Sequence, residues 1–364
     1  MAQNRNISDG DIRNMILKQG GVDRCVLCGK CASVCPSFRE FKKEVFSPRG
    51  RTALAKAFLE EKLIPGERYL ETLSCCLFCR ACEKACPTHV RPGWINQLLK
   101  NLPEFEKLHE NILPVLQMDQ NNPYPESLFR RLGWKISPIS FEERFRESAQ
   151  ELKTGGKLAE VVYFPGCIHN HVFPEAARST MSLLEKLGYR IMIPEGLRCC
   201  GAPYIYAGDL KTARNLIEKN LRVFEKCQDK TILCDCAGCA STIRFWSDLF
   251  PEGSEEKNLA ENMAGNAYIF SDFLKKFSPS IFSHIPDLNA LKWAEEIPCN
   301  GWALWLCSEC PDMLDSILKR IDKYVAEKKL ENLITEDAAC YAFLKKNLSS
   351  VKIISLSELL ENNL

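Results

Sequence analysis

A doubled cysteine motif constrains this chain more than any other feature of its sequence. Cys25 opens a run with the pattern C-x2-C-x2-C-x3-C-P, and Cys76 opens a second run with the same pattern. Three cysteines at this spacing wrap a tight turn around a common centre, while the fourth precedes a proline that ends the loop and points away. The fold must therefore be built around two thiol-rich loops.

The spacing also selects the group that these loops bind. In such a run, three thiolates ligate one [4Fe-4S] cubane and the fourth ligates the other. A pair of structural zinc sites is the alternative, but zinc has no use for the third cysteine or for the Cys-Pro pair. We therefore expect two cubanes with crossed ligands, one on Cys25, Cys28, Cys31 and Cys86, the other on Cys76, Cys79, Cys82 and Cys35.

Composition agrees with metal ligation. The N-terminus lacks the apolar core of a signal peptide, and no apolar stretch approaches the roughly 20 residues needed to span a bilayer, so we expect a cytoplasmic protein without a transmembrane segment. Twenty cysteines would not persist there as a disulfide framework. Lys plus Arg (48) nearly equal Asp plus Glu (47), and no basic face is built, which argues against nucleic acid as a partner.

Helices are expected around the two cysteine runs. Apolar periodicity predicts helices over residues 52–62, 68–75 and 92–102, so this domain should be more helical than a minimal ferredoxin. Arg49 and Arg51 lie between the runs and face either a cluster or a partner, or else belong to a solvated loop. Cys75 belongs to neither ligand set.

A second type of structure begins after a proline-rich segment. Residues 103–156 contain five prolines and a Gly-Gly pair, and we interpret them as a linker. From there, short apolar runs alternate with helical periodicity, which predicts an α/β module with a largely parallel sheet. The expected strands cover residues 161–164, 189–193 and 231–233, and the expected helices residues 175–187 and 209–226.

Cysteines follow the predicted strands of this module. Sites in open α/β sheets gather at the carboxyl ends of strands, so these thiols should converge. Five exceed the four ligands of a cubane or a zinc site, which leaves one spare or requires an unusual cluster. His169 and His171 either assist this site or lie on an exposed loop, which we favour. The converging residues would be Cys167, Cys199, Cys200, Cys236 and Cys239.

The C-terminal third resembles this module at an offset of about one hundred residues. Cys199-Cys200-Gly201 aligns with residues 299–301, and the strand before Cys236 aligns with Leu333-Ile334. Asn300 and Asp337 replace Cys200 and Cys236, so the copy has lost its ligands. Nearby, Cys307 and Cys310 form an extra C-x-x-C, either a redox dithiol, a weak metal site or, as we favour, unreactive core thiols.

These observations define a fold class and its domains. We expect an α+β multidomain protein, in which a helical ferredoxin domain with two [4Fe-4S] clusters precedes two Rossmann-like α/β cysteine-rich modules, the second degenerate. The expected boundaries are residues 1–102 for the ferredoxin-like domain, 103–156 for the linker, 157–280 for the first module and 281–364 for the second.

The motifs together carry a family resemblance. Two ferredoxin runs separated by Ser47-Pro48-Arg49-Gly50-Arg51 and followed by Phe164-Pro165-Gly166-Cys167 and a Cys-Cys-Gly module resemble the iron-sulfur subunit of glycolate oxidase. The Cys-Cys-Gly module is shared with heterodisulfide reductases. The resemblance implies that Cys167, Cys199, Cys200, Cys236 and Cys239 hold a third, noncubane [4Fe-4S] cluster, with zinc as the fallback.

The resemblance also implies a function. The chain would pass electrons from the flavin of an FAD-containing flavoprotein subunit, which oxidises a 2-hydroxy acid such as glycolate or D-lactate, through its clusters to a further subunit or a quinone. It would be one subunit of an oxidoreductase complex, peripheral at the inner membrane face, and would itself carry no catalytic residue. No dinucleotide fingerprint, P-loop or nucleophile elbow contradicts this.

Two other hypotheses remain open. In one, the five-cysteine site itself cleaves a disulfide or another sulfur substrate, as in heterodisulfide reductases. In the other, the C-terminal modules bind zinc or nothing and serve as a docking scaffold.

Overall fold

The computed structural model describes residues 8–105, 119, 122–149, 160–227, 229–279 and 310–362. The chain divides into two compact units assembled from separate segments. Unit 1 comprises Met1–Pro114, Pro203–Lys211 and Glu295–Tyr324, and unit 2 comprises Val115–Ala202, Thr212–Ala294 and Val325–Leu364. The consecutive domain boundaries expected from the sequence stay a prediction.

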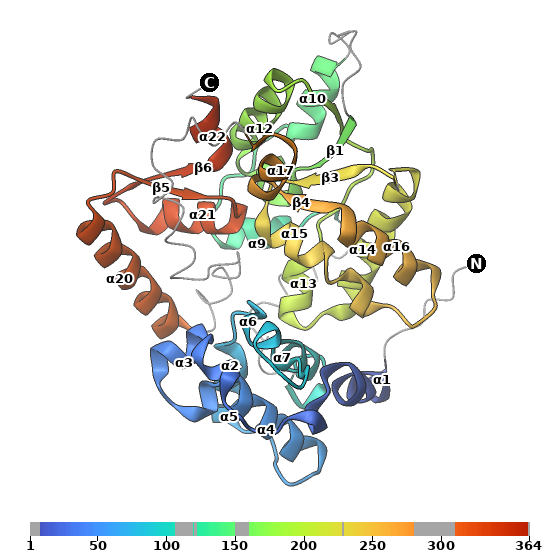
Figure 1. Ribbon diagram of the computed structural model, residues 1–364, viewed down its shortest axis with the longest axis vertical. Coiled ribbons are helices and arrows are strands. Elements are labelled where there is room, and N and C mark those ends of the chain that lie inside the picture. The colour runs from blue at the N-terminus through green and yellow to red at the C-terminus, as the bar shows by residue number, and fades with distance from the viewer. Residues whose placement is uncertain are drawn as a thin grey trace. The chain divides into compact units, whose positions relative to one another are not determined.

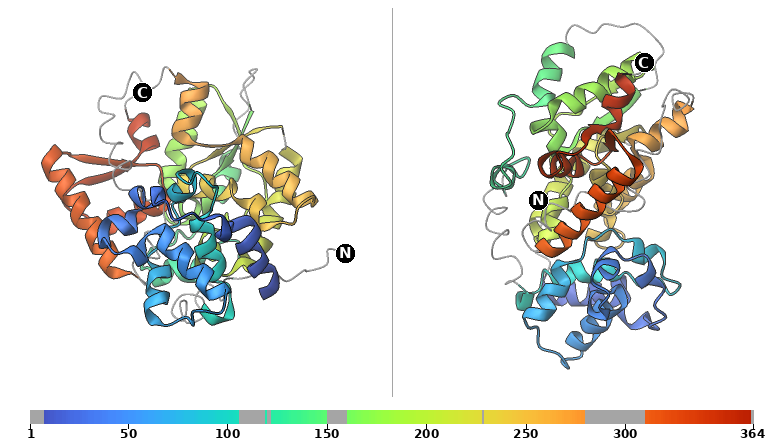
Figure 2. Two further views of the ribbon diagram at one scale, coloured as in Figure 1. Left: turned by 60° about the horizontal axis from the view of Figure 1, so that its bottom comes forward. Right: turned by 90° about the vertical axis from the view of Figure 1, so that its left-hand side faces the viewer.

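The first segment of unit 1 is helical, and its helices gather together in both views of Figure 2. The helices predicted over residues 52–62, 68–75 and 92–102 are confirmed as α4, α5 and α7. Short turns η1 (Ile16–Gly20), η2 (Val22–Arg24) and η3 (Glu44–Phe46) connect the helices. These are α1 (Asp9–Met15), α2 (Lys30–Ser33), α3 (Pro36–Phe41), α4 (Pro48–Leu59), α5 (Glu67–Ser74), α6 (Ala81–Lys84) and α7 (Pro92–Leu99).

Helix α4 shows how the sequence sets this architecture. The hydroxyl of Ser47 accepts a hydrogen bond from the Gly50 amide (2.9 Å), and Pro48 occupies the first helical position, where its missing amide costs nothing. Ala55 and Phe58 are buried on one face of α4, which packs against α7. Helix α7 is buried along its whole length, so it forms the centre of this helical cluster.

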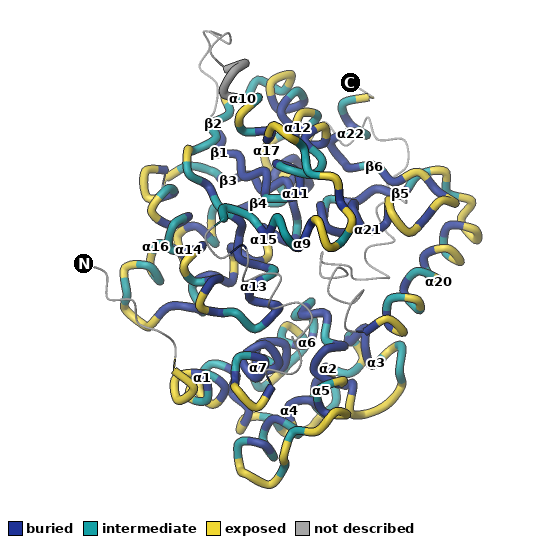
Figure 3. Tube along the Cα trace, turned by 180° about the vertical axis from the view of Figure 1, so that it is seen from behind, coloured by how far each residue is buried: buried dark blue, intermediate teal, exposed yellow. Residues whose placement is uncertain are grey.

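Unit 2 is built on a four-stranded parallel sheet (Figure 1), which confirms the α/β prediction. The strand order is β2-β1-β3-β4, and the connections contain helices, as parallel neighbours require. Strands β1 and β3 are coloured as buried in Figure 3, which fits their continuous apolar sequences. The strands are β1 (Glu160–Phe164), β2 (Arg190–Met192), β3 (Thr231–Cys234) and β4 (Ala267–Ile269).

The helices of this region follow the expected order. Helices α12 and α14 confirm the predictions over residues 175–187 and 209–226. The helices are α11 (Gly166–His171), α12 (Pro174–Lys186), α14 (Leu210–Phe224), α15 (Ala237–Ile243), α16 (Glu255–Asn266) and α17 (Phe270–Phe277), with turns η5 (Glu225–Cys227) and η6 (Trp246–Leu249). Helix α13 (Ala202–Ala207) precedes α14 and belongs almost entirely to unit 1.

A second, two-stranded parallel sheet follows helix α20 (Pro311–Lys328). Strand β5 (Asn332–Thr335), helix α21 (Ala338–Asn347), strand β6 (Lys352–Ser355) and helix α22 (Leu356–Glu361) repeat the order of β3, α15, β4 and α17. Ile334 and Leu360 lie in the same apolar core as Tyr163, so the repeated elements complete the core of unit 2. Residues 299–301 lie outside the described residues.

The expected linker contains helical structure. Helices α9 (Glu126–Arg131) and α10 (Phe141–Ala149) lie within it. Phe129 packs against Trp134, and Phe141 packs edge-on against Tyr163, so apolar burial outweighs the prolines of this segment. None of the helices in the described stretches is long and apolar enough to cross a membrane.

Candidate metal centres

The two cysteine runs of unit 1 wind in the same way. Leu27 and Phe78, each the residue before the second cysteine of its run, have φ angles of 53° and 49°. Gly29 and Arg80, each the residue after that cysteine, have φ angles of 82° and 59°. Left-handed backbone is unfavourable for Leu, Phe and Arg and is found where a loop must curl around a ligand. Both loops are therefore shaped for the same group.

The first thiol set combines cysteines from both runs. Cys31 lies in the short helix α2 and interacts electrostatically with Cys25 of its own run and Cys86 of the other. Burial, followed by repulsion from these thiols, raises the pKa of Cys31 to about 11. Burial also opposes ionisation of Cys86, but hydrogen bonds from Thr88 and the Val90 amide outweigh it and lower its pKa. Cys28, the remaining member, is exposed.

The second thiol set combines three cysteines of the second run with Cys35 of the first. Burial raises the pKa of Cys79 to about 12, and Cys76 and Cys35 add repulsion. Cys82 interacts with the same two thiols and with Cys79. Four thiols crowded in this way can exchange their protons for metal ions, which relieves their mutual repulsion. A single cavity is lined by Cys35, Cys76, Cys79 and Cys82.

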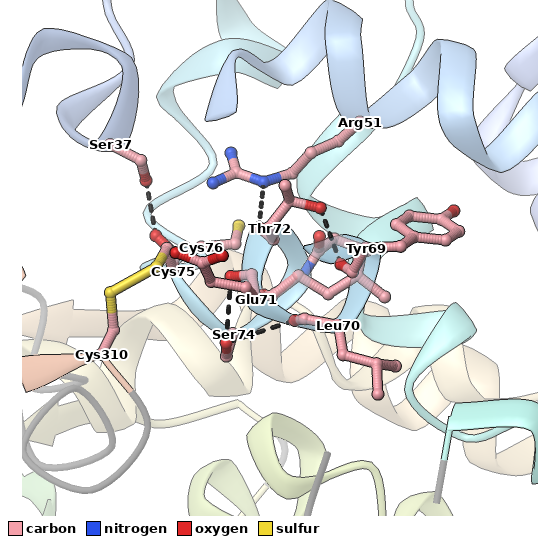
Figure 4. The surroundings of a disulfide bond; sticks show 12 residues. Ser37, Arg51, Tyr69, Leu70, Glu71, Thr72, Ser74, Cys75, Cys76 and Cys310 are labelled. Carbon is pink, nitrogen blue, oxygen red and sulfur yellow. Dashed lines mark hydrogen bonds between the residues drawn. A yellow bond between two sulfur atoms is a disulfide. The ribbon is translucent and has the colours of Figure 1, made fainter. Parts of the chain in front are cut away.

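Arg51 provides an independent test of whether this cavity fits a cluster. Its side chain is 3% exposed, and its Nε donates to the Thr72 carbonyl at 2.7 Å (Figure 4). Its Nη1 lies 4.0 Å from the Cys35 sulfur, and its Nη2 has no hydrogen-bond partner among the described residues. A buried guanidinium needs an acceptor, and the sulfides and thiolates of a cluster are anionic acceptors. The residues present therefore fit a [4Fe-4S] group.

Arg49 has a different environment. It forms a two-point ion pair with Glu44 (2.6 and 3.0 Å) and donates to the Leu27 carbonyl at 3.2 Å. Its side chain is partly exposed, at 36%. Arg49 thus fastens the first cysteine loop. The alternative of a solvated loop for both arginines is wrong for Arg51, which is buried.

In unit 2 the structure brings together the five cysteines singled out in the sequence. The Cys167 thiol donates to the Cys199 sulfur at 3.8 Å. Further thiol hydrogen bonds join Cys199 to Cys200, Cys200 to Cys239, and Cys239 to Cys236, so the contacts run unbroken through all five. Hydrogen bonding to neighbouring thiols, together with burial, raises the pKa values of Cys199, Cys200 and Cys239.

Side chains around the site hold the backbone of these cysteines in place. Trp246 donates its indole N–H to the Cys200 carbonyl at 2.9 Å, and the Asn220 amide donates to the Cys199 carbonyl at 3.1 Å. Gly166 has a φ of 71°, and a Cβ there would lie 2.9 Å from the Cys239 sulfur. Glycine is required because the backbone approaches the thiols so closely.

Two residues near this site were not predicted as part of it. Cys234, the last residue of β3, is fully buried and interacts electrostatically with Cys236 and Cys200. Asp337, from the degenerate repeat, accepts a hydrogen bond from the Gly238 amide at 2.7 Å and lies 3.7 Å from the Cys236 sulfur. In the sequence, the alignment of Asp337 with Cys236 in the repeat was the one signal that linked Asp337 to this site.

The histidines differ from the expectation of an exposed loop. His169 lies in α11 and is 3% exposed, with Nδ1 3.1 Å from the Asp235 carboxylate, which also accepts from Tyr163 (2.6 Å). Its Nε2 has no partner among the described residues. His171 stacks on Tyr124 at 3.5 Å between centroids, and burial lowers its pKa to about 4. That expectation is wrong because α11 turns this segment into the core.

The five-thiol site fits a cluster better than a lone zinc ion. Five sulfurs exceed a tetrahedral shell. Contiguous thiols spread around a volume suit a polynuclear group.

Cys307 and Cys310 of the extra C-x-x-C were expected to be unreactive core thiols, and this expectation is wrong for Cys310. Cys310 forms a disulfide with Cys75, with 5.6 Å between their Cα atoms (Figure 4). Cys75 ends helix α5 directly before Cys76, so the residue left over in the sequence has a partner. Cys307 lies outside the described residues.

Comparison with known families agrees with these two sites. A family described as "4Fe-4S dicluster domain" matches residues 21–90, and one described as "Cysteine-rich domain", the CCG family, matches residues 161–244. The chain carries both domains. The first match spans all eight cysteines of the doubled motif, and the second spans all five cysteines of the unit 2 site.

Relatives confirm the resemblance drawn from the motifs. A probable glycolate oxidase iron-sulfur subunit of Bacillus subtilis is 26% identical over 66% of this chain and 63% of its own length. One subunit of the fumarate reductase (CoM/CoB) of Methanothermobacter marburgensis is 24% identical over 93% of this chain and 71% of its own. One subunit of the dihydromethanophenazine:CoB–CoM heterodisulfide reductase of Methanosarcina barkeri is 26% identical over 60% of this chain and 56% of its own length. The chain thus spans less than two thirds of the length of the Bacillus subtilis and Methanosarcina barkeri relatives.

Proposed function

We propose that this chain is the iron-sulfur electron-transfer subunit of an FAD-linked 2-hydroxyacid oxidase or dehydrogenase, of the glycolate or D-lactate type. Electrons from a flavoprotein partner would pass through [4Fe-4S] clusters to an acceptor subunit or quinone. The observation that carries the proposal is the crossing of cysteines in unit 1. Cys35 lines one cavity with Cys76, Cys79 and Cys82, and Cys31 interacts electrostatically with Cys86, as the ligand exchange of a two-cubane domain requires.

The protein's own residues would position and tune these centres. One cubane would be held by Cys25, Cys28, Cys31 and Cys86, and the other by Cys76, Cys79, Cys82 and Cys35. When bound, such clusters accept and release single electrons without large structural change. Arg51 would hydrogen-bond and stabilise negative charge at the second cubane, while Arg49 would fasten the loop around the first.

We also propose a third, noncubane [4Fe-4S] cluster on Cys167, Cys199, Cys200, Cys236 and Cys239. The unbroken contacts among these five thiols, one more than a tetrahedral shell can use, support it. Zinc is the fallback.

Iron analysis of anaerobically purified protein tests the cluster assignment. We expect about twelve irons per chain, and about eight in a Cys200→Ala variant whose cubane EPR signals are unchanged. About eight irons in both proteins would remove the third cluster.

Copurification of a flavin-containing protein that reduces the clusters with glycolate or D-lactate tests the electron path. Clusters that no 2-hydroxy acid reduces through such a partner would contradict it.

A second function has a specific observation in its favour. Cys167 is the partly exposed member of the five-thiol site, and a pocket at its edge is lined by Cys167, Cys199 and His171. Cys167 thus gives the site an edge that a sulfur substrate would approach, in a subunit of the heterodisulfide reductase kind. Turnover of a disulfide with a reduced viologen dye, without any flavoprotein, would favour this function over the first.

A further inference from the structure

The disulfide between Cys75 and Cys310 has an unusual setting. The thirteen cysteines assigned to the clusters form no disulfide, whereas Cys75 and Cys310, beside the second of these thiol sets, do. Disulfides that persist among reduced thiols inside cells are mostly redox-active. From this setting, and resting on the proposed function, we propose that Cys75–Cys310 is a two-electron centre reduced by the neighbouring cubane clusters.

Its position supports electron exchange with the second cubane. Cys75 is covalently adjacent to Cys76, an assigned ligand, and one peptide unit separates their Cα atoms. The Ser37 hydroxyl donates to the Cys75 carbonyl at 2.6 Å, and Ser37 also lines the cavity of the second thiol set (Figure 4). The disulfide thus borders the wall of that cavity.

Burial excludes the usual chemistry of disulfides. Cys75 is 1% exposed and Cys310 is 5% exposed. Thiol-disulfide exchange needs direct attack of a thiolate on sulfur, and a buried bond denies that access. Electrons from an adjacent cluster need no such approach. The reductant favoured by the structure is therefore internal.

The stoichiometry is balanced by the clusters of unit 1. Reduction breaks the S–S bond, and two electrons and two protons convert Cys75 and Cys310 to thiols. Two cubanes held by the eight cysteines of unit 1 would supply one electron each, which accounts for both electrons. The protons come from solvent.

A second attachment makes the reaction reversible. The Glu40 carboxylate pairs with Arg320 and accepts from the Ser316 hydroxyl, both on α20. Cys310 immediately precedes this helix. When the S–S bond opens, these contacts keep the two thiols near each other, and a short effective loop favours their reoxidation.

Peptide mapping of the cluster-loaded protein tests the inference. Samples purified anaerobically are analysed before and after stoichiometric dithionite, with EPR reporting cluster reduction and mass spectrometry reporting the Cys75–Cys310 linked peptides. We expect the linked peptides before reduction and two alkylated thiols afterwards. In a Cys79→Ser variant, which lacks a ligand of the second cubane, the linked peptides should survive the same dithionite treatment.

Electron counting provides the second measurement. Wild-type protein should take up about two electrons more than a Cys310→Ser variant with equal cluster content. Cys227→Ser is the matched control, since this buried thiol lies beside Met192 and outside both sites, and its count should equal wild type.

Either of two results would overturn the inference. Linked peptides that survive in protein whose cubanes are fully reduced would exclude electron transfer to this bond, and free thiols in the oxidised, anaerobically purified protein would exclude the bond itself. The absence of cubane EPR signals would instead contradict the proposed function.

Discussion

A single buried arginine carries the clearest functional information at the scale of residues. Arg51 has a partner for Nε, approaches the Cys35 sulfur with Nη1 and leaves Nη2 without a described partner. A structural arginine would satisfy all of its donors with protein groups. The pattern instead fits a guanidinium whose remaining acceptor is the cluster, so its charge should favour the reduced state of the second cubane.

Replacing this charge should lower the reduction potential of that cluster. We expect Arg51→Met to shift it by roughly 50–100 mV to more negative values, because one charge at close range contributes about 2 kcal/mol in a protein interior. EPR-monitored redox titration measures the shift. Arg49→Met is the matched control and should leave this cluster unchanged, since Arg49 is partly exposed and paired with Glu44. Equal shifts in both variants would refute a local role for Arg51.

The sequence predicted the environments of individual side chains less well than it predicted helices and strands. The cysteine motifs predicted which thiols lie together, because the doubled run and the carboxyl ends of neighbouring parallel strands each impose a known arrangement. Burial of His169 and the approach of Asp337 to Cys236 could not be predicted, because both depend on contacts between segments far apart in the chain. Spacing reports local geometry, whereas burial is a property of tertiary packing.

At the scale of elements, the start of α11 is constrained by the five-thiol site. Gly166 combines a positive φ with a close approach to Cys239. We expect Gly166→Ala to lose about four irons while the cubane EPR signals persist. Gly253→Ala is the matched control, since Gly253 has a φ of 75° but no atom within 4 Å of an added Cβ. Equal iron loss in both variants would mean that backbone strain, not contact with Cys239, disrupts the site.

The degenerate repeat has a structural role that its missing ligands conceal. Asp337 caps α21 through the amides of Ala339 (3.0 Å) and Cys340 (2.8 Å) and reaches the Gly238 amide of α15. Order and periodicity of the elements predicted that the repeat persists, because strand and helix patterns survive loss of ligands. They did not predict that α9 and α10 form in the linker, since prolines dominate the local pattern there.

Removing this cap should loosen both helices. In Asp337→Ala, three buried amides lose their acceptor, which should cost about 2–4 kcal/mol of local stability. Hydrogen exchange of the α15 and α21 amides measures it, and we expect faster exchange in both helices. Asp337→Asn retains a carbonyl acceptor and should restore most of the protection. Faster exchange confined to α21 would show that Asp337 does not fasten α15.

At the scale of the whole molecule, the two thiol sets of the doubled motif lie in one compact unit and the five-thiol site lies in the other. Mutations in separate cooperative structures have additive effects. Iron losses in Cys79→Ala and Cys239→Ala should therefore sum in the double variant, with EPR identifying the cluster lost in each. Cys227→Ser should retain full iron. If Cys239→Ala also abolished the cubane signals, the clusters would assemble interdependently, and the electron path would have to be treated as one cooperative structure rather than as two independently folded centres.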